Sequence, residues 1–195
     1  QILRGFDDDL RAHLADAMRD RGVVIETNTL ITGIARDGQS DERSTGSGSH
    51  TQGYRMTLSD DRAIETGLVM LATGRRPNVA GLGLDRAGVQ TDEKGAIRVG
   101  TDSRTTSQSV WAVGDVTNRL ALTPIAIREG HAFADTVFGN RPWTCDHGTV
   151  PEAVFSTPEI GTVGLTEAEA RERHARVEVY RSTFRPMANV LSDSK

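Results

Sequence analysis

Two short, unbroken runs of apolar residues constrain the fold more than any other feature of the sequence. Residues 68–72 (LVMLA) and 110–113 (VWAV) contain no polar side chain, and a loop with glycine follows each run. Strands that are covered on both faces have this composition, because neither face meets water. Together with the helical patterns elsewhere, these strands favour an α/β or α+β fold over an all-α fold.

The remaining pattern predicts further helices and strands in mixed order. A helix is predicted over residues 7–21, where apolar residues repeat on one face, acidic residues crowd the start and Gly22 supplies the stop. Two more helices are predicted over 123–138 and 167–174. Strands are predicted over 23–25, 29–35, 54–58, 97–99, 153–155, 162–165 and 177–184, with a turn at Asp60-Asp61 after the strand 54–58.

Composition excludes several classes of protein. The chain has 23 basic and 27 acidic residues, a formal net charge of -4 and a pI of about 5.7, which argues against nucleic acid as a partner. No apolar run approaches the ~18 residues of a membrane span. The single cysteine, Cys145, excludes a disulfide framework and predicts a reducing, cytoplasmic compartment. The polar tract 37–53 is predicted to be a mobile loop, and we expect the chain to be part of a larger protein.

A ligand site is predicted where the second apolar run ends. Gly114 permits close approach of a ligand, and the carboxylate of Asp115 can accept hydrogen bonds from sugar-like hydroxyls. After Leu122, Thr123 is predicted as the N-cap and Pro124 as the first residue of a helix. The free N–H groups of such a helix start suit an anionic or electron-rich ligand atom. The plainer alternative is a strand turn followed by an ordinary capped helix.

Four motifs occur in one order along the chain: ATGRRPN at 72–78, WAVGD at 111–115, LTPIAIREG at 122–130 and VFSTPEIGTVGLTEAEA at 154–170. This order resembles the class I pyridine nucleotide-disulfide oxidoreductases, flavoenzymes that include glutathione, trypanothione and mercuric reductases and dihydrolipoamide dehydrogenase. The resemblance covers essentially the whole chain. It implies part of an FAD- and NAD(P)-binding, Rossmann-like two-domain fold, followed by the start of an α+β dimerisation domain.

The resemblance also implies a division of the chain and an activity for the larger protein. Residues 1–77 would be the C-terminal half of an NADPH-binding domain, 78–147 a returning segment of the FAD-binding domain and 148–195 the first part of the dimerisation domain. The larger protein would be a homodimer in which NADPH reduces FAD, and the electrons pass through a cysteine pair to glutathione disulfide.

Several residues match the family's cofactor positions. The resemblance implies that Asp115, after Gly114, holds the ribityl chain of FAD. It also implies that the helix start at Leu122 and Thr123 faces the pyrimidine ring of the flavin.

The segment ILRGFDDDLR at 2–11 resembles the glutathione reductase branch, in which Arg4 would contact the 2′-phosphate of NADPH. A guanidinium can grip a phosphate through two charge-assisted hydrogen bonds that NADH cannot offer. Alternatively, Arg4 is a solvated arginine before a helix. Gly74 and Arg75 belong to the loop that crosses between the cofactor domains. Arg75 would then lie near cofactor phosphates, or would form an interdomain salt bridge.

Other features of the chain argue against catalysis by this chain alone. His131 is predicted to be a half-buried helix residue, Cys145 a bystander thiol in a linker over 140–148, and no metal site is expected. A dithiol–disulfide cycle needs two cysteines, and neither glycine fingerprint for FAD or NADPH is present. The chain by itself is therefore predicted to be inactive. Trypanothione, lipoamide and mercuric reductases remain alternatives for the larger protein, as does a truncated binding or assembly module.

Overall fold

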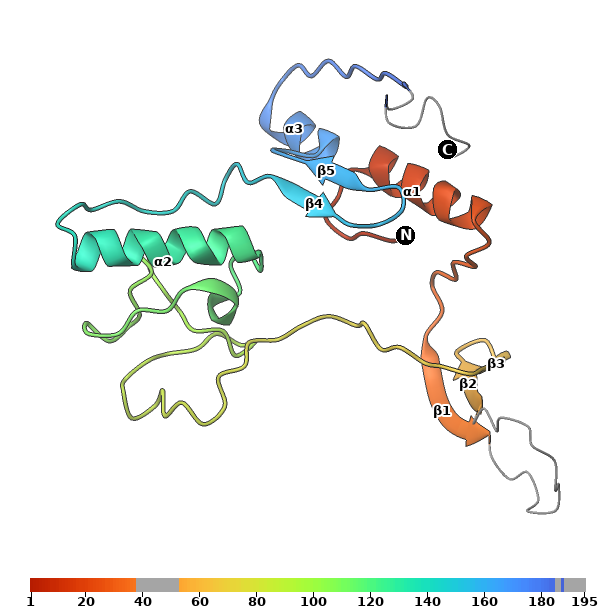
Figure 1. Cartoon of the computed structure of the whole chain (residues 1–195), viewed down its shortest axis with the longest axis horizontal. Helices are drawn as coiled ribbons and strands as arrows, with labels where there is room; N and C mark the ends of the chain where they lie inside the picture. The colour runs from red at the N-terminus through yellow and green to blue at the C-terminus, as the bar shows by residue number, and fades with distance from the viewer. Residues whose placement is uncertain (38–52, 185–186, 188–195) are drawn as a thin grey trace. The chain divides into compact units, whose positions relative to one another are not determined.

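The computed structural model describes residues 1–37, 53–184 and 187, and the chain divides into two compact units. One unit combines Gln1–Ile25 with Thr149–Lys195, and the other is Glu26–Gly148. Figure 1 shows the elements of both. The predicted division at 77/78 and 147/148 into cofactor and dimerisation domains stays a prediction.

The first unit begins with helix α1 (Asp8–Asp20), which confirms the predicted helix. Asp7 is its N-cap, and a side-chain oxygen of Asp7 accepts a hydrogen bond of 3.0 Å from the N–H of Asp9. Leu14 is buried, and Leu10 and Met18 on the same face are half-buried. The predicted apolar face is therefore the face that packs.

A short hairpin and a second helix complete the described part of this unit. Strands β4 (Glu152–Val154) and β5 (Ile160–Thr162) pair antiparallel, and α3 (Glu167–Arg173) follows. Thr166 and Glu169 form a capping box at the start of α3, and the hydrogen bonds from Thr166 lower the pKa of the Glu169 carboxyl. The second oxygen of Asp7 accepts the N–H of Glu167 at 2.8 Å, so one aspartate serves the first turns of both helices.

The second unit contains a three-stranded antiparallel sheet. Its strands are β1 (Ile31–Asp37), β2 (Gly53–Leu58) and β3 (Ala63–Thr66), in that order. The predicted turn at Asp60-Asp61 lies between β2 and β3, but the sequence pattern did not predict β3 itself. Arg62 donates hydrogen bonds to the carboxylates of Glu26 and Asp60, which lowers the pKa of each carboxyl.

The prediction that residues 37–53 form a loop is wrong at both ends of that tract. Asp37 and Gly53 are not loop residues, because they pair with each other as the last and first residues of β1 and β2. Residues 38–52, the rest of the tract, lie outside the described part of the chain.

Five predicted strands, 97–99 among them, are not formed as strands within the described residues, and the predicted strand 162–165 overlaps β5 only at Thr162. Segments 23–25, 68–72 and 177–184 lie outside the strands, and Leu68 and Met70 are 78% and 84% exposed. Segment 110–113 makes one isolated bridge, between Arg104 and Trp111. Apolar composition indicates burial, but a strand also needs a neighbour for its N–H and C=O groups. These segments have no ladder partner among the described residues.

A small core holds the part of the second unit that follows. Val89, Ile97 and Ala112 are buried there, and partly buried side chains surround them, namely Val79, Leu84, Val99, Val110 and Val116. Isolated bridges replace the predicted strand 97–99, linking Thr91 to Ile97 and Val99 to Thr105. The chain leaves this core at Gly114.

A 3₁₀ turn and a long helix follow the core. The turn η1 spans Gly114–Thr117, and α2 spans Thr123–Val137, close to the predicted helix. The predicted N-cap is wrong by one residue: Leu122 is the N-cap, without a side-chain hydrogen bond, and Thr123 is already helical. The carbonyl of Leu122 accepts the N–H groups of both Ile125 and Ala126 at 3.0 Å, so the helical pattern begins one residue earlier.

Aromatic side chains join α2 to the core. The rings of Trp111 and Phe133 lie 5.5 Å apart between centroids, and the Arg104 guanidinium lies 4.7 Å above the ring of Trp111. Among the residues that the structure describes, no helix is both long and apolar enough to cross a membrane.

Gly114 and Gly130 provide a matched pair of substitutions near α2. Gly114 has a φ of +73°, and a Cβ there would lie 3.1 Å from the Cβ of Ala126, whereas a Cβ on the helical Gly130 meets nothing within 4 Å. Gly114→Ala should therefore lower the free energy of unfolding by about 1–3 kcal/mol. Gly130→Ala should raise it by about 0.5–1 kcal/mol.

Urea unfolding monitored by tryptophan fluorescence measures the free energy of unfolding of both variants. Trp111 and Trp143 lie on either side of α2 in the sequence, and both contact it. Equal stability of the two variants would show that the close approach at Gly114 does not constrain this unit.

Candidate functional site

The turn at Gly114 and Asp115 presents a carboxylate to solvent directly after the core. The backbone of Gly114 is buried, whereas the Asp115 side chain is 52% exposed. The ordered turn thus carries an accessible hydrogen-bond acceptor on a buried base. This arrangement matches the predicted role of Gly114 as a point of close approach and of Asp115 as the acceptor, and both roles stay predictions.

The structure brings two separate motifs together at this turn. Nη1 of Arg75 lies 3.6 Å from Oδ2 of Asp115, although the residues are far apart in sequence. Arg75 is 83% exposed, and Gly74 before it has a φ of +118°, a conformation that favours glycine. The guanidinium is thus free to exchange the Asp115 carboxylate for another anion.

The start of α2 supplies groups of the opposite kind. Thr123 is exposed and Leu122 is half-buried. The N–H of Leu122 donates to the carbonyl of Leu120 at 2.9 Å, whereas the N–H of Thr123 makes no hydrogen bond with any residue that the structure describes. A carboxylate that accepts from hydroxyls, together with an N–H that can donate to a carbonyl oxygen, is a donor and acceptor set that suits the ribityl chain and the ring of a flavin. The chemistry of these residues fits FAD.

Arg4 lies in the other unit, in the turn that precedes α1. Leu3 and Gly5 on either side have φ values of +51° and +90°, so the chain bends sharply there. Arg4 is exposed, and its guanidinium makes no hydrogen bond or ion pair with any residue that the structure describes. It is therefore available to an anionic ligand, as the predicted contact with a 2′-phosphate requires.

A buried charge that the sequence pattern did not predict lies beneath the turn. Glu129, on α2, is 1% exposed. Its Oε2 accepts the N–H of Gly114 at 2.6 Å, and its Oε1 lies 2.8 Å from Nη2 of Arg119 and 2.6 Å from Nε2 of His147. Because a carboxylate oxygen only accepts, we assign the proton of the His147 contact to Nε2.

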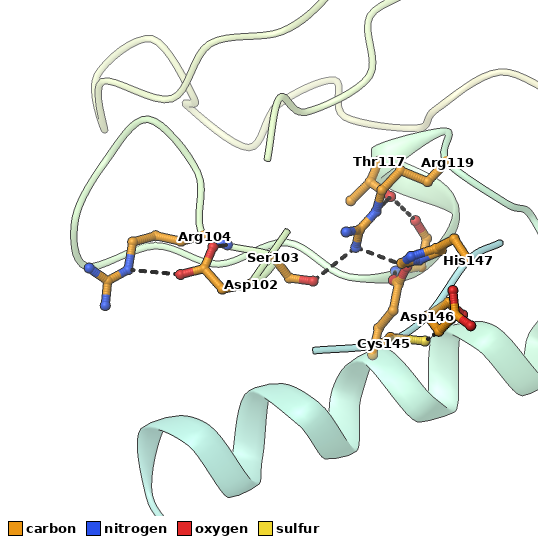
Figure 2. Close-up of polar contacts among 10 residues, drawn as sticks. Asp102, Ser103, Arg104, Thr117, Arg119, Cys145, Asp146 and His147 are labelled. Carbon is orange, nitrogen blue, oxygen red and sulfur yellow. Dashed lines mark hydrogen bonds and ion pairs between the residues drawn. The ribbon is translucent and has the colours of Figure 1, made fainter. Parts of the chain in front are cut away.

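Arg119 connects this carboxylate to the far end of η1. Its Nε donates to Oγ1 of Thr117 at 3.2 Å, and its Nη2 donates to Oγ of Ser103 at 2.8 Å. Oγ1 of Thr117 in turn donates to the carbonyl of Gly114 at 2.8 Å. Figure 2 shows Arg119 reaching from the turn toward Ser103, with His147 beside it. Both backbone polar groups of Gly114 are thereby held.

A signal for Glu129 was present in the helical pattern. Ile125, Glu129 and Ala132 follow the spacing of one helix face, and all three are buried. A charged residue on the apolar face of an amphipathic helix needs buried partners. Sequence spacing could identify the buried face, but nothing in it identified Arg119 and His147 as the partners.

Two predictions about neighbouring residues are wrong. Segment 140–148 is not a free linker: the backbone and indole N–H groups of Trp143 donate to Thr136 and Asp135 of α2, and His147 reaches Glu129. His131 is exposed rather than half-buried. Cys145, within segment 140–148, is buried, and its thiol contacts the carbonyl of Asp146 at 3.7 Å (Figure 2).

The chain is similar over its whole length to enzymes of known type. It is 49% identical to glutathione reductase of Burkholderia cepacia over 192 residues, which cover 98% of this chain and 40% of that protein. It is 41% identical to trypanothione reductase of Trypanosoma congolense over 194 residues, covering 100% of this chain and 37% of that protein. The chain thus spans about two fifths of the length of these relatives.

Solved structures agree with this similarity. The flavoprotein disulfide reductase RclA of Escherichia coli superposes with a TM-score of 0.75 at 29% identity, covering 88% of this chain and 37% of that one. LpdA of Mycobacterium tuberculosis superposes with a TM-score of 0.76 at 27% identity, covering 89% and 35%.

Two family models match the chain. Residues 1–130 match the pyridine nucleotide-disulphide oxidoreductases, and residues 150–195 match the dimerisation domain of the same family. These matches confirm the resemblance that the four motifs indicated and the mixed fold class that it implied. The first match alone covers about two thirds of the residues, and the chain therefore belongs to the pyridine nucleotide-disulphide oxidoreductase family.

Proposed function

We propose that the protein to which this chain belongs is an NADPH-dependent flavoprotein that reduces glutathione disulfide to glutathione. The observation that carries the proposal is the exposed Asp115 carboxylate on a buried, hydrogen-bonded turn, with Arg75 beside it. The 49% identity to a glutathione reductase supports the choice of substrate. The whole protein would act as a homodimer in the cytoplasm, with residues 148–195 in its dimerisation domain, as the match of 150–195 supports.

In this proposal the chain binds and orients the cofactors. FAD, when bound, supplies the redox chemistry. Asp115 would accept hydrogen bonds from the ribityl hydroxyls, and Gly114 would leave room for close approach. The helix start at Leu122 and Thr123 would hold the pyrimidine side of the ring, with the N–H of Thr123 as the available donor. The positive end of the α2 dipole would stabilise negative charge there. The catalytic cysteine pair would lie in another part of the protein, because this chain has one cysteine.

Two arginines would recognise the anionic parts of the cofactors. Arg4, which has no ion pair among the described residues, would bind the 2′-phosphate that distinguishes NADPH from NADH. Arg75, after Gly74, would lie near cofactor phosphates, and its exposed pair with Asp115 would be weak enough to open, since such pairs contribute about 0–1 kcal/mol.

A second candidate substrate is trypanothione disulfide. The 41% identity to a trypanothione reductase along the whole chain favours it. Assays of the full-length protein with NADPH and each disulfide separate the two candidates. Turnover of neither disulfide would contradict the proposed function and would favour another reductase or a non-catalytic module.

The 195-residue chain alone should be colourless and inactive. Asp115 and the start of α2 provide one side of a flavin site, and the chain has no glycine fingerprint for a pyrophosphate. The measurement is the absorbance of the purified chain after incubation with FAD and gel filtration. Stoichiometric flavin absorbance would show that these residues form a complete site.

Replacement of Arg4 by Met should weaken the use of NADPH but hardly that of NADH. Methionine keeps an apolar stem but removes the planar cation, and only NADPH carries the 2′-phosphate. Loss of a hydrogen bond with a charged group should lower the selectivity for NADPH over NADH about 10–150-fold. Because Arg4 is exposed, we expect a loss toward the low end of this range. The measurement is kcat/KM for both nucleotides in the full-length protein. Arg21→Met, an exposed arginine after α1, is the control, and equal losses with both nucleotides would contradict the assignment.

Replacement of Asp115 by Ala should release FAD from the full-length protein. The lost hydrogen bonds to the carboxylate should weaken FAD binding about 10–150-fold, whereas the stability of the flavin-free protein should change little, because the pair with Arg75 is exposed. Glu65→Ala is a matched control, since Glu65 forms a pair with Arg55 that is also exposed and also at 3.6 Å. Unchanged flavin content in Asp115→Ala would refute the role of Asp115.

A further inference from the structure

The buried carboxylate of Glu129 touches the turn that carries Asp115, and the proposed roles of the cofactor-binding residues leave it unexplained. From this contact we propose that Glu129, held by Arg119, is a positioning residue for the flavin: it sets the conformation of the Gly114–Asp115 turn and thereby the direction of the Asp115 carboxylate. This inference rests on the proposed flavin site at Asp115.

The first arm of the arrangement acts on the N–H of Gly114. Oε2 of Glu129 accepts that N–H at 2.6 Å, in a site where Glu129 is almost fully buried. Hydrogen bonds to a charged acceptor are short and about twice as strong as neutral ones. Gly114 directly precedes Asp115, so the backbone conformation of Gly114 sets the direction in which the side chain of Asp115 leaves the backbone.

The second arm acts on the carbonyl of Gly114 through two further residues. Arg119 pairs with Oε1 of Glu129 at 2.8 Å and donates to Oγ1 of Thr117, which donates to the carbonyl of Gly114. Glu129 therefore reaches both sides of one peptide turn, directly on one side and through Arg119 on the other. A residue that only filled the core would need neither of these polar contacts.

The requirement for a carboxylate follows from the geometry. Two separate oxygens accept hydrogen bonds here, Oε2 from Gly114 and Oε1 from Arg119 and His147. The amide of a glutamine has the same shape but only one acceptor oxygen. In Glu129→Gln an NH₂ group must face either the N–H of Gly114 or the donors on the other side, and one arm is lost.

The test uses the full-length flavoprotein and four proteins: the wild type, Glu129→Gln, Asp115→Ala and the double variant. Titration of each flavin-free protein with FAD, followed by flavin fluorescence, gives the Kd. Glu129→Gln should raise the Kd about ten- to one-hundredfold. Since Glu129 acts through the Asp115 turn, the double variant should lose less than the product of the two single losses.

A spectroscopic readout separates positioning from general stability. Visible circular dichroism of the flavin that remains bound to Glu129→Gln should differ from that of the wild type, because the Asp115 carboxylate has moved. Arg128→Gln, an exposed position adjacent on α2, is the matched control and should keep the Kd and the spectrum of the wild type. If Glu129→Gln does not fold, Arg119→Lys replaces it. Lysine keeps the charge near Glu129 but not the fork that also reaches Thr117, so the Kd should rise at least several-fold.

The outcomes distinguish the two proposals. The positioning role would be overturned if Glu129→Gln, or Arg119→Lys where that variant is used, kept the Kd and the spectrum of the wild type. It would also be overturned if the rise in Kd of the double variant equalled the product of the two single rises. An unchanged Kd in Asp115→Ala alone would instead overturn the proposed flavin site. Coupled losses with an altered flavin spectrum would support both.

Discussion

The contact between the Glu129 carboxylate and the N–H of Gly114 is the interaction on which the candidate site depends. A charge that is 99% removed from solvent is tolerated only where hydrogen-bond donors surround it, and Gly114, Arg119 and His147 provide them. Removing one partner of a buried charge pair typically costs about 3–5 kcal/mol, so this carboxylate ties η1, α2 and the returning segment at His147 to one arrangement.

This arrangement places an exposed acceptor on a turn that hydrogen bonds hold in one conformation. Asp115 is exposed and pairs loosely with Arg75, whereas the preceding glycine is fixed through both of its backbone polar groups. A ligand that replaces Arg75 at the carboxylate would meet a group whose position is already set, which reduces the entropy lost on binding. The exposed part of the site is the side chain, and the buried part is the turn beneath it.

Membership of the family and the proposed activity rest on different kinds of evidence. The family follows from matches that extend over nearly the whole chain, including the dimerisation model over residues 150–195. The activity would require residues beyond those of this chain, which has one cysteine and spans about two fifths of its relatives. The contribution argued for this chain is therefore the binding and orientation of cofactors by Arg4, Arg75, Asp115 and the start of α2.

The sequence by itself determined the helices, the turn at Asp60-Asp61 and the family, because local periodicity, caps and short motifs encode these features. The cofactor-binding roles that the same motifs indicate stay predictions. The sequence pattern misjudged segment 68–72 as a strand and segment 140–148 as a linker. A strand forms only beside a neighbouring backbone, and the positions of Trp143 and His147 depend on contacts with α2. Neither kind of partner is adjacent in sequence. Only the tertiary structure decided that Glu129 meets Gly114, Arg119 and His147. The reason is physical: a buried charge is stabilised by donors that the fold brings together from distant positions in the chain.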